Sequence, residues 1–263
     1  MNSVPSIVRF LLVASTVGIV ASGRAHAAEP LTVVLDAGHG GSNIGAKGRG
    51  AAVYEKNLTL AVTRLLEKRL GLAGVHVVLT RGRDRYLTLR QRSRVAEEAK
   101  ADLFVSLHAN ASPQHNQRGI ETYFLSREAA DVEARRSAAR APAPALALVA
   151  ELQRLEAQRS SARLARLVQK RLAEARPTQN RGVRQGPYDV LGELSVPAIL
   201  VEIGFLDHAL EGPELQQPEI QRAIAGAIAQ GILDYAGNDR RVALRGVGPT
   251  GPASPVAPTT KDN

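Results

Sequence analysis

The chain has 263 residues, no cysteine and a formal net charge of +9. Without thiols it can form neither disulfides nor thiolate zinc sites, so any metal would need His, Asp or Glu ligands. The basic charge favours a polyanionic partner such as the cell wall or outer-envelope lipids. An aromatic content of 3%, without a recognition motif, argues against nucleic acid.

The two ends of the chain differ in composition from its centre. Residues 1–27 are typical of a secretory signal peptide, with an apolar stretch over 10–22 and a small-x-small cleavage motif ending at Ala27. That stretch is too short to span a bilayer, and no other run approaches the ~18 apolar residues required. We therefore expect an exported protein without stable membrane insertion. Residues 239–263 are predicted to be a disordered tail, which leaves one domain over 28–238.

The first apolar run of this domain ends in a histidine set among glycines. Val33 to Leu35 predict a strand buried on both faces. The glycines that follow leave His39 at the carboxyl end of this strand, where open α/β sheets bind ligands. A helix with apolar residues at three- and four-residue intervals then begins at Glu55. Since such a helix starts near the same sheet edge, Glu55 is expected close to His39, although a first-turn glutamate is also explained by the helix dipole.

The next two strands differ in where their histidines lie. His76 begins a strand over 75–79, which places it at the opposite sheet edge, so it is interpreted as structural. A capping box at Thr88-Leu89-Arg90-Gln91 opens the following helix. The run from Asp102 to Leu107 repeats the opening pattern, because a buried strand again ends in a histidine, His108. Two strands that deliver a histidine to one edge are hard to explain by chance.

The region from 115 to 176 is predicted to contain one strand and two helices. Gly119–Leu125 reads as a strand in which Glu121 faces solvent, with a position lining the site as the alternative. His115, in the loop before it, is expected to be solvated. A surface excursion follows over 126–145, and two helical stripes come next, with Ser160-Ser161 marking a break or cap between them.

The last strand ends in an ionisable residue. Ala198 to Val201 are apolar and Glu202 closes the run, after which isoleucines at four-residue intervals from Ile220 predict a closing helix. A carboxylate at the end of a buried strand is costly unless it is paired, metal-bound or needed for chemistry. Glu202 therefore joins the candidate site residues.

Together, strand ends and a helix start supply two imidazoles and two carboxylates at one sheet edge. Two imidazoles and one carboxylate with an open fourth position are the ligand set of catalytic zinc. The other carboxylate then suits a general base or acid. No serine is placed as a nucleophile, since Ser106 lies inside a strand without the sharp turn that a nucleophile needs.

The segments that carry these residues resemble the zinc-dependent N-acetylmuramoyl-L-alanine amidases of bacterial cell-wall turnover, known as amidase type 3. The matching segments within Leu31 to Tyr235 are Leu35–Gly41, Tyr54–Asn57, Ala101–Asn110, Gly119–Tyr123 and Val201–Leu206. The resemblance implies one zinc ion held by His39, Glu55 and His108, with Glu202 as the catalytic glutamate. Asn110 and Glu121 are candidate substrate-binding residues.

The resemblance also implies a fold and a substrate. The fold is an α/β three-layer αβα sandwich around a mostly parallel sheet, in agreement with the alternation of strands and helices. The substrate is peptidoglycan, cut between N-acetylmuramic acid and L-alanine of the stem peptide. Such an enzyme acts in wall remodelling or daughter-cell separation, in the periplasm or outside the cell. Zinc would activate a water and polarise the scissile carbonyl, while Glu202 moves the proton to the leaving nitrogen.

Two features depart from the family pattern. Asp207-His208 stands where relatives commonly carry Ser-Asn, which would alter the groove or add a ligand near Glu202. Some periplasmic relatives carry a long helical insert that blocks the zinc until a protein activator arrives, and the corresponding region here is comparatively short. Residues 146–159 are the candidate gate, with a helix permanently packed on the sheet as the alternative.

Two rival functions remain at this point. A metallocarboxypeptidase with the same ligands would cut peptide bonds of the wall instead. A non-catalytic cell-wall-binding protein would require a damaged site, whereas all four candidate residues are present.

Overall fold

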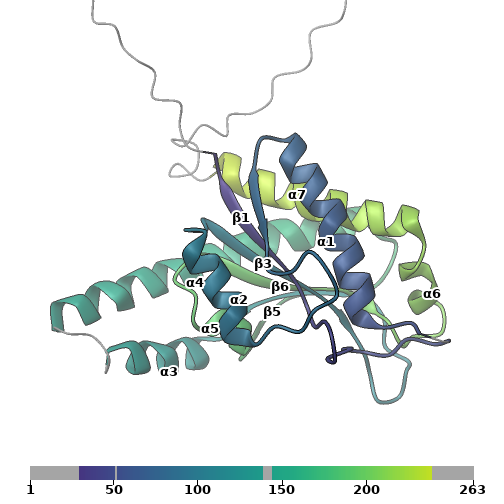
Figure 1. Ribbon diagram of the computed structural model, residues 1–263, viewed down its shortest axis with the longest axis horizontal. Helices are drawn as coiled ribbons and strands as arrows, with labels where there is room; N and C mark the ends of the chain where they lie inside the picture. The colour runs from purple at the N-terminus through teal and green to yellow at the C-terminus, as the bar shows by residue number, and fades with distance from the viewer. Residues whose placement is uncertain (1–29, 51, 139–143, 239–263) are drawn as a thin grey trace, which may run out of the picture.

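The computed structural model describes residues 30–50, 52–138 and 144–238. Over these residues one sheet has helices packed on both of its faces (Figure 1). The arrangement confirms the α/β sandwich expected from the sequence. The predicted signal peptide at 1–27 and the predicted tail at 239–263 lie outside the described residues and remain predictions.

The sheet has six strands in the order β2-β1-β3-β6-β4-β5. Their bounds are β1 Thr32–Ala37, β2 His76–Leu79, β3 Leu103–Asn110, β4 Ile120–Leu125, β5 Asn180–Gly186 and β6 Ala198–Phe205. Strands β2, β1, β3 and β6 are parallel, so their carboxyl ends meet at one edge. Strand β4 runs antiparallel to β6, and β5 runs parallel to β4. The reversed β4 therefore begins at the edge where β6 ends.

Seven helices accompany the sheet in the described part of the chain. They are α1 Glu55–Leu72, α2 Leu89–Glu98, α3 Arg127–Ala138, α4 Pro144–Ala175, α5 Asp189–Gly192, α6 Glu211–Leu215 and α7 Pro218–Asn238. Side chains alternate between the two faces of a strand. Val33 and Leu35 of β1 accordingly pack in the core beneath α1, α4 and α7, while Val34 packs in the second core beside α2 and α5. Strand β1 is thus buried on both faces, as its apolar run predicts.

One expectation for the middle of the chain was wrong, and one helix was missed. The surface excursion over 126–145 contains the helix α3, and α4 runs through Ser160-Ser161 without a break. The helix continues because the Ser161 hydroxyl donates to the Ala157 carbonyl, one turn earlier, at 2.6 Å. The same hydroxyl accepts the backbone N–H of Ala198 at 2.8 Å, so its polar group is satisfied inside the helix.

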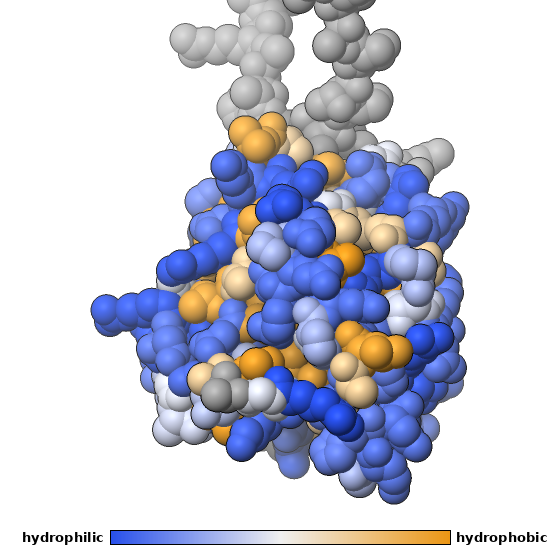
Figure 2. Space-filling view, turned by 90° about the vertical axis from the view of Figure 1, so that its right-hand side faces the viewer, coloured by the Kyte–Doolittle hydropathy of each residue, from blue (hydrophilic) through white to orange (hydrophobic). Residues whose placement is uncertain are grey.

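The first half of α4 lies beside α3 and projects from the body of the molecule at the left of Figure 1. Its apolar side chains are exposed and include Leu148, Val149, Leu152 and Leu155. Elsewhere, the face in Figure 2 is mainly hydrophilic with separate apolar patches. Among the described residues, no helix combines the length and apolar character needed to cross a membrane.

Candidate active site

The first candidate ligand follows β1 in a backbone conformation that few residues adopt. His39 has φ of +61°, in the left-handed region. Gly38, directly before it, packs so closely on the His108 ring that a Cβ would overlap the ring. The His39 Nδ1 atom lies 2.9 Å from Asn43 Oδ1, which directs Nε2 towards Glu55 Oε2, 3.0 Å away. The glycines of this loop therefore allow the two imidazoles to approach each other.

Glu55 is the first residue of α1, and its carboxylate lies between the two imidazoles. The Oε1 atom is 2.9 Å from His108 Nδ1, while the backbone N–H groups of Ala46 and Ala109 also donate to the carboxylate. Burial raises the pKa of this carboxyl, but the hydrogen bonds and charges of His108 and His39 outweigh it. The pKa of Glu55 is therefore well below its usual range. The group is ionised and held rigidly.

The three predicted ligands form one cluster. Their nearest ligand-type atoms all lie within 4.8 Å of one another, and the two imidazole rings meet edge to face with centroids 4.8 Å apart. Burial lowers the pKa of His39, but the hydrogen bond and charge of Glu55 outweigh it, so the pKa is raised overall. Two nitrogens and one ionised carboxylate in this arrangement fit a zinc ion.

Glu202 lies one strand away from this cluster. It is the register partner of His108 across the β3–β6 pair, and it is only 8% exposed. Its Oε2 atom is buried and has no hydrogen-bond partner. Burial raises the pKa of Glu202 well above its usual range, and the charges of Glu55 and Glu121 add to this shift. A carboxylate with these properties suits proton transfer better than a structural role.

The two imidazoles of the cluster and Glu202 line a common cavity of about 520 Å³. Besides His39, His108 and Glu202, its walls include Tyr86 and Tyr188. Within residues 146–159, the side chains that the structure describes (148, 149 and 151–159) do not line this cavity. Gln158, near the end of this segment, donates to the carbonyl of Leu125 at the end of β4 at 3.2 Å. The gate stays a prediction.

The prediction that Glu121 faces solvent was wrong. Glu121 is 2% exposed, and it is the cross-strand partner of Glu202 on the reversed strand β4. Its carboxylate accepts hydrogen bonds from the Asn110 amide at 2.7 Å and the Arg181 guanidinium at 3.0 Å, with Arg184 3.2 Å away. Asn110 is half-buried, so part of its side chain is accessible. The hydrogen bond to Glu121 fixes the orientation of the Asn110 amide.

The remaining candidates do not join the metal cluster. Asp207 is buried and accepts the Ser112 N–H at 2.9 Å, and its carboxylate lies 2.6 Å from His115 Nδ1. His208 Nδ1 accepts the backbone N–H of Glu211 at the start of α6. The expectation of a spare ligand here was therefore wrong, since both side chains serve the loops. His115 is 60% exposed, as predicted, although it is also paired with Asp207. His76 lies exposed at the start of β2, away from the site.

Sequence reasoning missed several residues that shape the site. Arg181 and Arg184 lie on β5, whose sequence Asn-Arg-Gly-Val-Arg-Gln-Gly lacks the apolar pattern of a strand. Tyr188, in the cavity wall, follows in the loop after β5. The role of Asn43 could have been predicted from the sequence, because a short polar side chain four residues after a ligand histidine is well placed to orient its ring.

Comparison with known proteins assigns the chain to a family. The model of the family described as N-acetylmuramoyl-L-alanine amidase matches residues 33–234, a span that contains the three clustered ligands and Glu202. The chain belongs to this family. The sequence-based resemblance is thus confirmed.

Individual members of the amidase family agree with this assignment. The uncharacterized protein YqiI of Bacillus subtilis is 34% identical, with 80% of this chain and 89% of YqiI covered. The N-acetylmuramoyl-L-alanine amidase LytC of the same organism is 30% identical over 78% of this chain, which spans only 35% of LytC. The crystal structure of the N-acetylmuramoyl-L-alanine amidase from Clostridium difficile 630 has a TM-score of 0.66 and 29% identity. That comparison covers 80% of this chain and 99% of the other.

Proposed function

We propose that this protein is a zinc-dependent N-acetylmuramoyl-L-alanine amidase that hydrolyses the amide between N-acetylmuramic acid and L-alanine in peptidoglycan. The observation that carries the proposal is the His39–Glu55–His108 cluster, with the buried Glu202 beside it and a cavity open to both. Family membership supports the choice of bond, and the cluster supports the choice of a metal-assisted reaction.

His39, Glu55 and His108 are the residues that would hold the zinc ion. When bound there, zinc lowers the pKa of a water and polarises the carbonyl of the substrate. The protein orients its ligands through their other atoms, since Asn43 fixes the His39 ring and the Ala46 and Ala109 N–H groups fix Glu55. Hydrogen bonds that metal ligands make through their other atoms set the orientation of the imidazole ring and the affinity for the metal.

Glu202 is the proposed proton carrier. Its unpartnered oxygen and raised pKa allow it to take a proton from the attacking water and to keep it long enough to pass it on. The proton then goes to the departing alanine nitrogen, because an amine leaves poorly unless it is protonated. One residue therefore serves first as general base and then as general acid.

The substrate groove extends beyond the reacting centre. A second hollow of about 830 Å³ shares Tyr86, Leu89 and Tyr188 with the site cavity and reaches Val132 on α3. We call these two connected hollows the extended groove. A long open groove suits a polymer of linked sugars and peptides. Asn110, whose amide donates to Glu121, is a proposed substrate contact.

The proposed place of action follows from the substrate. Peptidoglycan lies outside the cytoplasmic membrane, so the enzyme would act in the periplasm or at the cell exterior. A signal peptide at residues 1–27 would deliver it there. Removal of the signal with Arg9 and Arg24 lowers the net charge from +9 to +7, which still favours attraction to a polyanionic envelope. Because no described side chain of residues 146–159 lines the cavity, the proposal does not require a protein activator that displaces them.

The test is to identify the bond that is cut. Purified peptidoglycan is incubated with the protein, with and without a zinc chelator, and new amino termini are labelled and identified. We expect L-alanine amino termini that appear only without chelator and are restored by added zinc. Release of free amino acids from the ends of the stem peptides would instead identify a carboxypeptidase. Binding to the wall without any new termini would identify a non-catalytic protein.

A further inference from the structure

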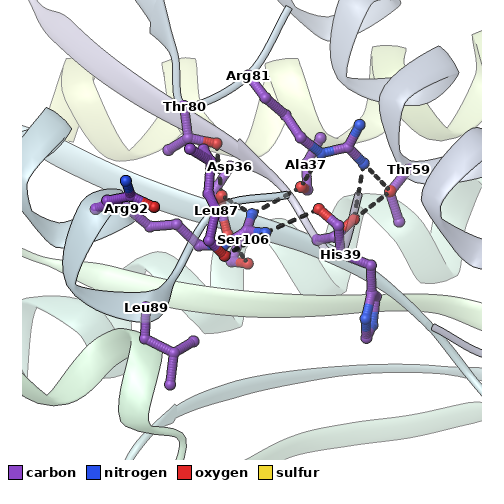
Figure 3. Close-up of polar contacts among 12 residues, drawn as sticks. Asp36, Ala37, His39, Thr59, Thr80, Arg81, Leu87, Leu89, Arg92 and Ser106 are labelled. Atoms are coloured by element: carbon purple, nitrogen blue, oxygen red, sulfur yellow. Dashed lines mark hydrogen bonds and ion pairs between the residues drawn. The ribbon is translucent and has the colours of Figure 1, made fainter. Parts of the chain in front are cut away.

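Three buried charged side chains lie beside the ligand set, and two of them, Asp36 and Arg92, also border the site cavity. Asp36 and Arg81 are completely buried and Arg92 is 4% exposed. Buried charges are costly unless each is paired and hydrogen-bonded. Here two guanidinium groups face one carboxylate, so most of their N–H groups must find other acceptors. Figure 3 shows both guanidiniums directed at the main chain that precedes the His39 ring.

Arg81 joins the His39 loop to the start of α1. Its Nε donates to the Ala37 carbonyl at 2.8 Å, and its Nη2 donates to the Gly38 carbonyl at 2.8 Å. The same Nη2 donates to the Lys56 carbonyl at 2.9 Å, in the first turn of α1, directly after Glu55. The Thr59 hydroxyl, also on α1, adds a bond to the Gly38 carbonyl at 2.9 Å. A single guanidinium therefore fixes the distance between the backbones that carry His39 and Glu55.

Arg92 and Asp36 join the same loop to β3. Arg92 Nη2 donates to the His39 carbonyl at 2.8 Å, and its Nη1 pairs with Asp36 Oδ1 at 2.6 Å. The other Asp36 oxygen accepts the Ser106 hydroxyl at 2.7 Å. Ser106 precedes His108 by two residues on β3. The backbones of His39 and His108 are thus connected through one buried ion pair.

We infer that these three residues, here called the Asp36–Arg81–Arg92 network, position all three metal ligands before a metal binds. The inference rests on the metal site of the proposed function. The carbonyls of Ala37, Gly38 and His39 are all bound by the two guanidiniums, which holds His39 in its left-handed conformation. Without these bonds the loop would relax towards more favourable backbone angles and carry the imidazole away from Glu55.

The test measures zinc affinity in variants that keep the positive charge of each arginine but lose the hydrogen-bond geometry of its guanidinium. Arg81→Lys and Arg92→Lys retain a cation, but an ammonium cannot donate along the same fixed fork. Arg176→Lys is the matched control, because Arg176 is also 2% exposed and ion-paired, with Glu211 and Glu214, but touches none of the ligand-bearing elements. Zinc affinity is measured by competition with a chromophoric chelator, and urea unfolding of the zinc-free proteins gives their stability.

We expect Arg81→Lys and Arg92→Lys to weaken zinc binding by about 10- to 100-fold, the usual effect of losing contacts that orient ligands. Arg176→Lys should bind zinc as the wild type does, whatever its change in the free energy of unfolding, because its ion pairs are with Glu211 and Glu214. Unchanged zinc affinity in both network variants would overturn the inference, as would an equal loss in the control. Failure of the wild type to bind zinc would overturn the proposed function instead.

A milder pair of variants covers the case in which the lysine variants do not fold. Ser106→Ala removes the hydroxyl that donates to Asp36. Thr59→Val removes the hydroxyl that donates to the Gly38 carbonyl and accepts from Arg81 Nη2, and both variants keep the two guanidiniums. Both should weaken zinc binding by a measurable factor, with a larger effect when they are combined. Wild-type affinity in the double variant would overturn the inference.

Discussion

Replacing Glu202 by glutamine separates the proposed proton carrier from the metal ligands. The amide has nearly the shape of the carboxylate but cannot accept a proton at neutral pH. Loss of a general base slows a reaction by ~10²–10⁴-fold, which is about 3–5 kcal/mol in activation free energy. We expect the upper end of this range, because the same group would also protonate the leaving nitrogen.

Although Glu202→Gln should slow the reaction, the surroundings of Glu202 predict that this substitution does not lower the free energy of unfolding. Its Oε2 is buried without a partner, and its pKa is raised in the folded protein. A carboxyl with a raised folded pKa adds stability below its unfolded pKa and loses it as the pH rises through the folded value. The carboxyl therefore opposes folding once the pH rises through its folded pKa. Glu202→Gln should leave the free energy of unfolding at pH 7 equal or higher, and it should weaken the pH dependence.

The measurement combines three readings on the same protein. Release of L-alanine amino termini gives the rate, metal analysis gives the zinc content, and urea unfolding with chelator at pH 5 and pH 8 gives the stability. We expect the Glu202→Gln protein to retain zinc, to lose most of its rate and to keep its free energy of unfolding. Turnover near the wild-type value would refute the role of Glu202. Loss of zinc together with a lower free energy of unfolding would show that Glu202 is structural.

Other substitutions test the rest of the site. His39→Ala should lose tightly bound zinc after dialysis, and full retention measured by metal analysis would remove it from the ligand set. Tyr86→Ala should raise KM for polymeric peptidoglycan more than for an isolated muropeptide, whereas equal changes would contradict the extended groove. Leu152→Gln alters a side chain that is 57% exposed, so the free energy of unfolding should change by no more than ~0.5 kcal/mol. Its activity should also be unchanged, and a several-fold rise would show that residues 146–159 restrain the enzyme.

The part of the site that the sequence predicts comes from patterns local to single strands. A buried strand reveals itself by its apolar run, and parallel strands must end at the same edge. These two facts were enough to bring His39, His108 and Glu202 together. Glu55 was added because a helix that follows a strand in this kind of fold begins near the same edge of the sheet, and Glu55 is the first residue of α1. In the structure, ligand-type atoms of His39, Glu55 and His108 lie within 4.8 Å of one another.

The errors arose where the deciding contact is distant in sequence. Strand β5 is held by pairing with β4, and its Arg181 contacts Glu121, a partner 60 residues away. Nothing within β5 itself indicates that contact. Glu121 was misplaced for the same reason, since only the guanidiniums of β5 explain how a carboxylate can be buried there. Ser161 likewise stays within α4 because Ala198 supplies a distant hydrogen bond.

The reversed direction of β4 has an evolutionary consequence. Because β4 begins where β3 ends, the connection over residues 111–119 never leaves the catalytic edge. Hydrogen bonds hold its two ends, since the backbone N–H of Ser112 donates to Asp207 and that of Gly119 donates to Glu211. The residues between these ends are exposed. Exposed loop tips accept insertions at little cost to a fold. This connection can therefore change in length and composition without altering the sheet or the three clustered side chains.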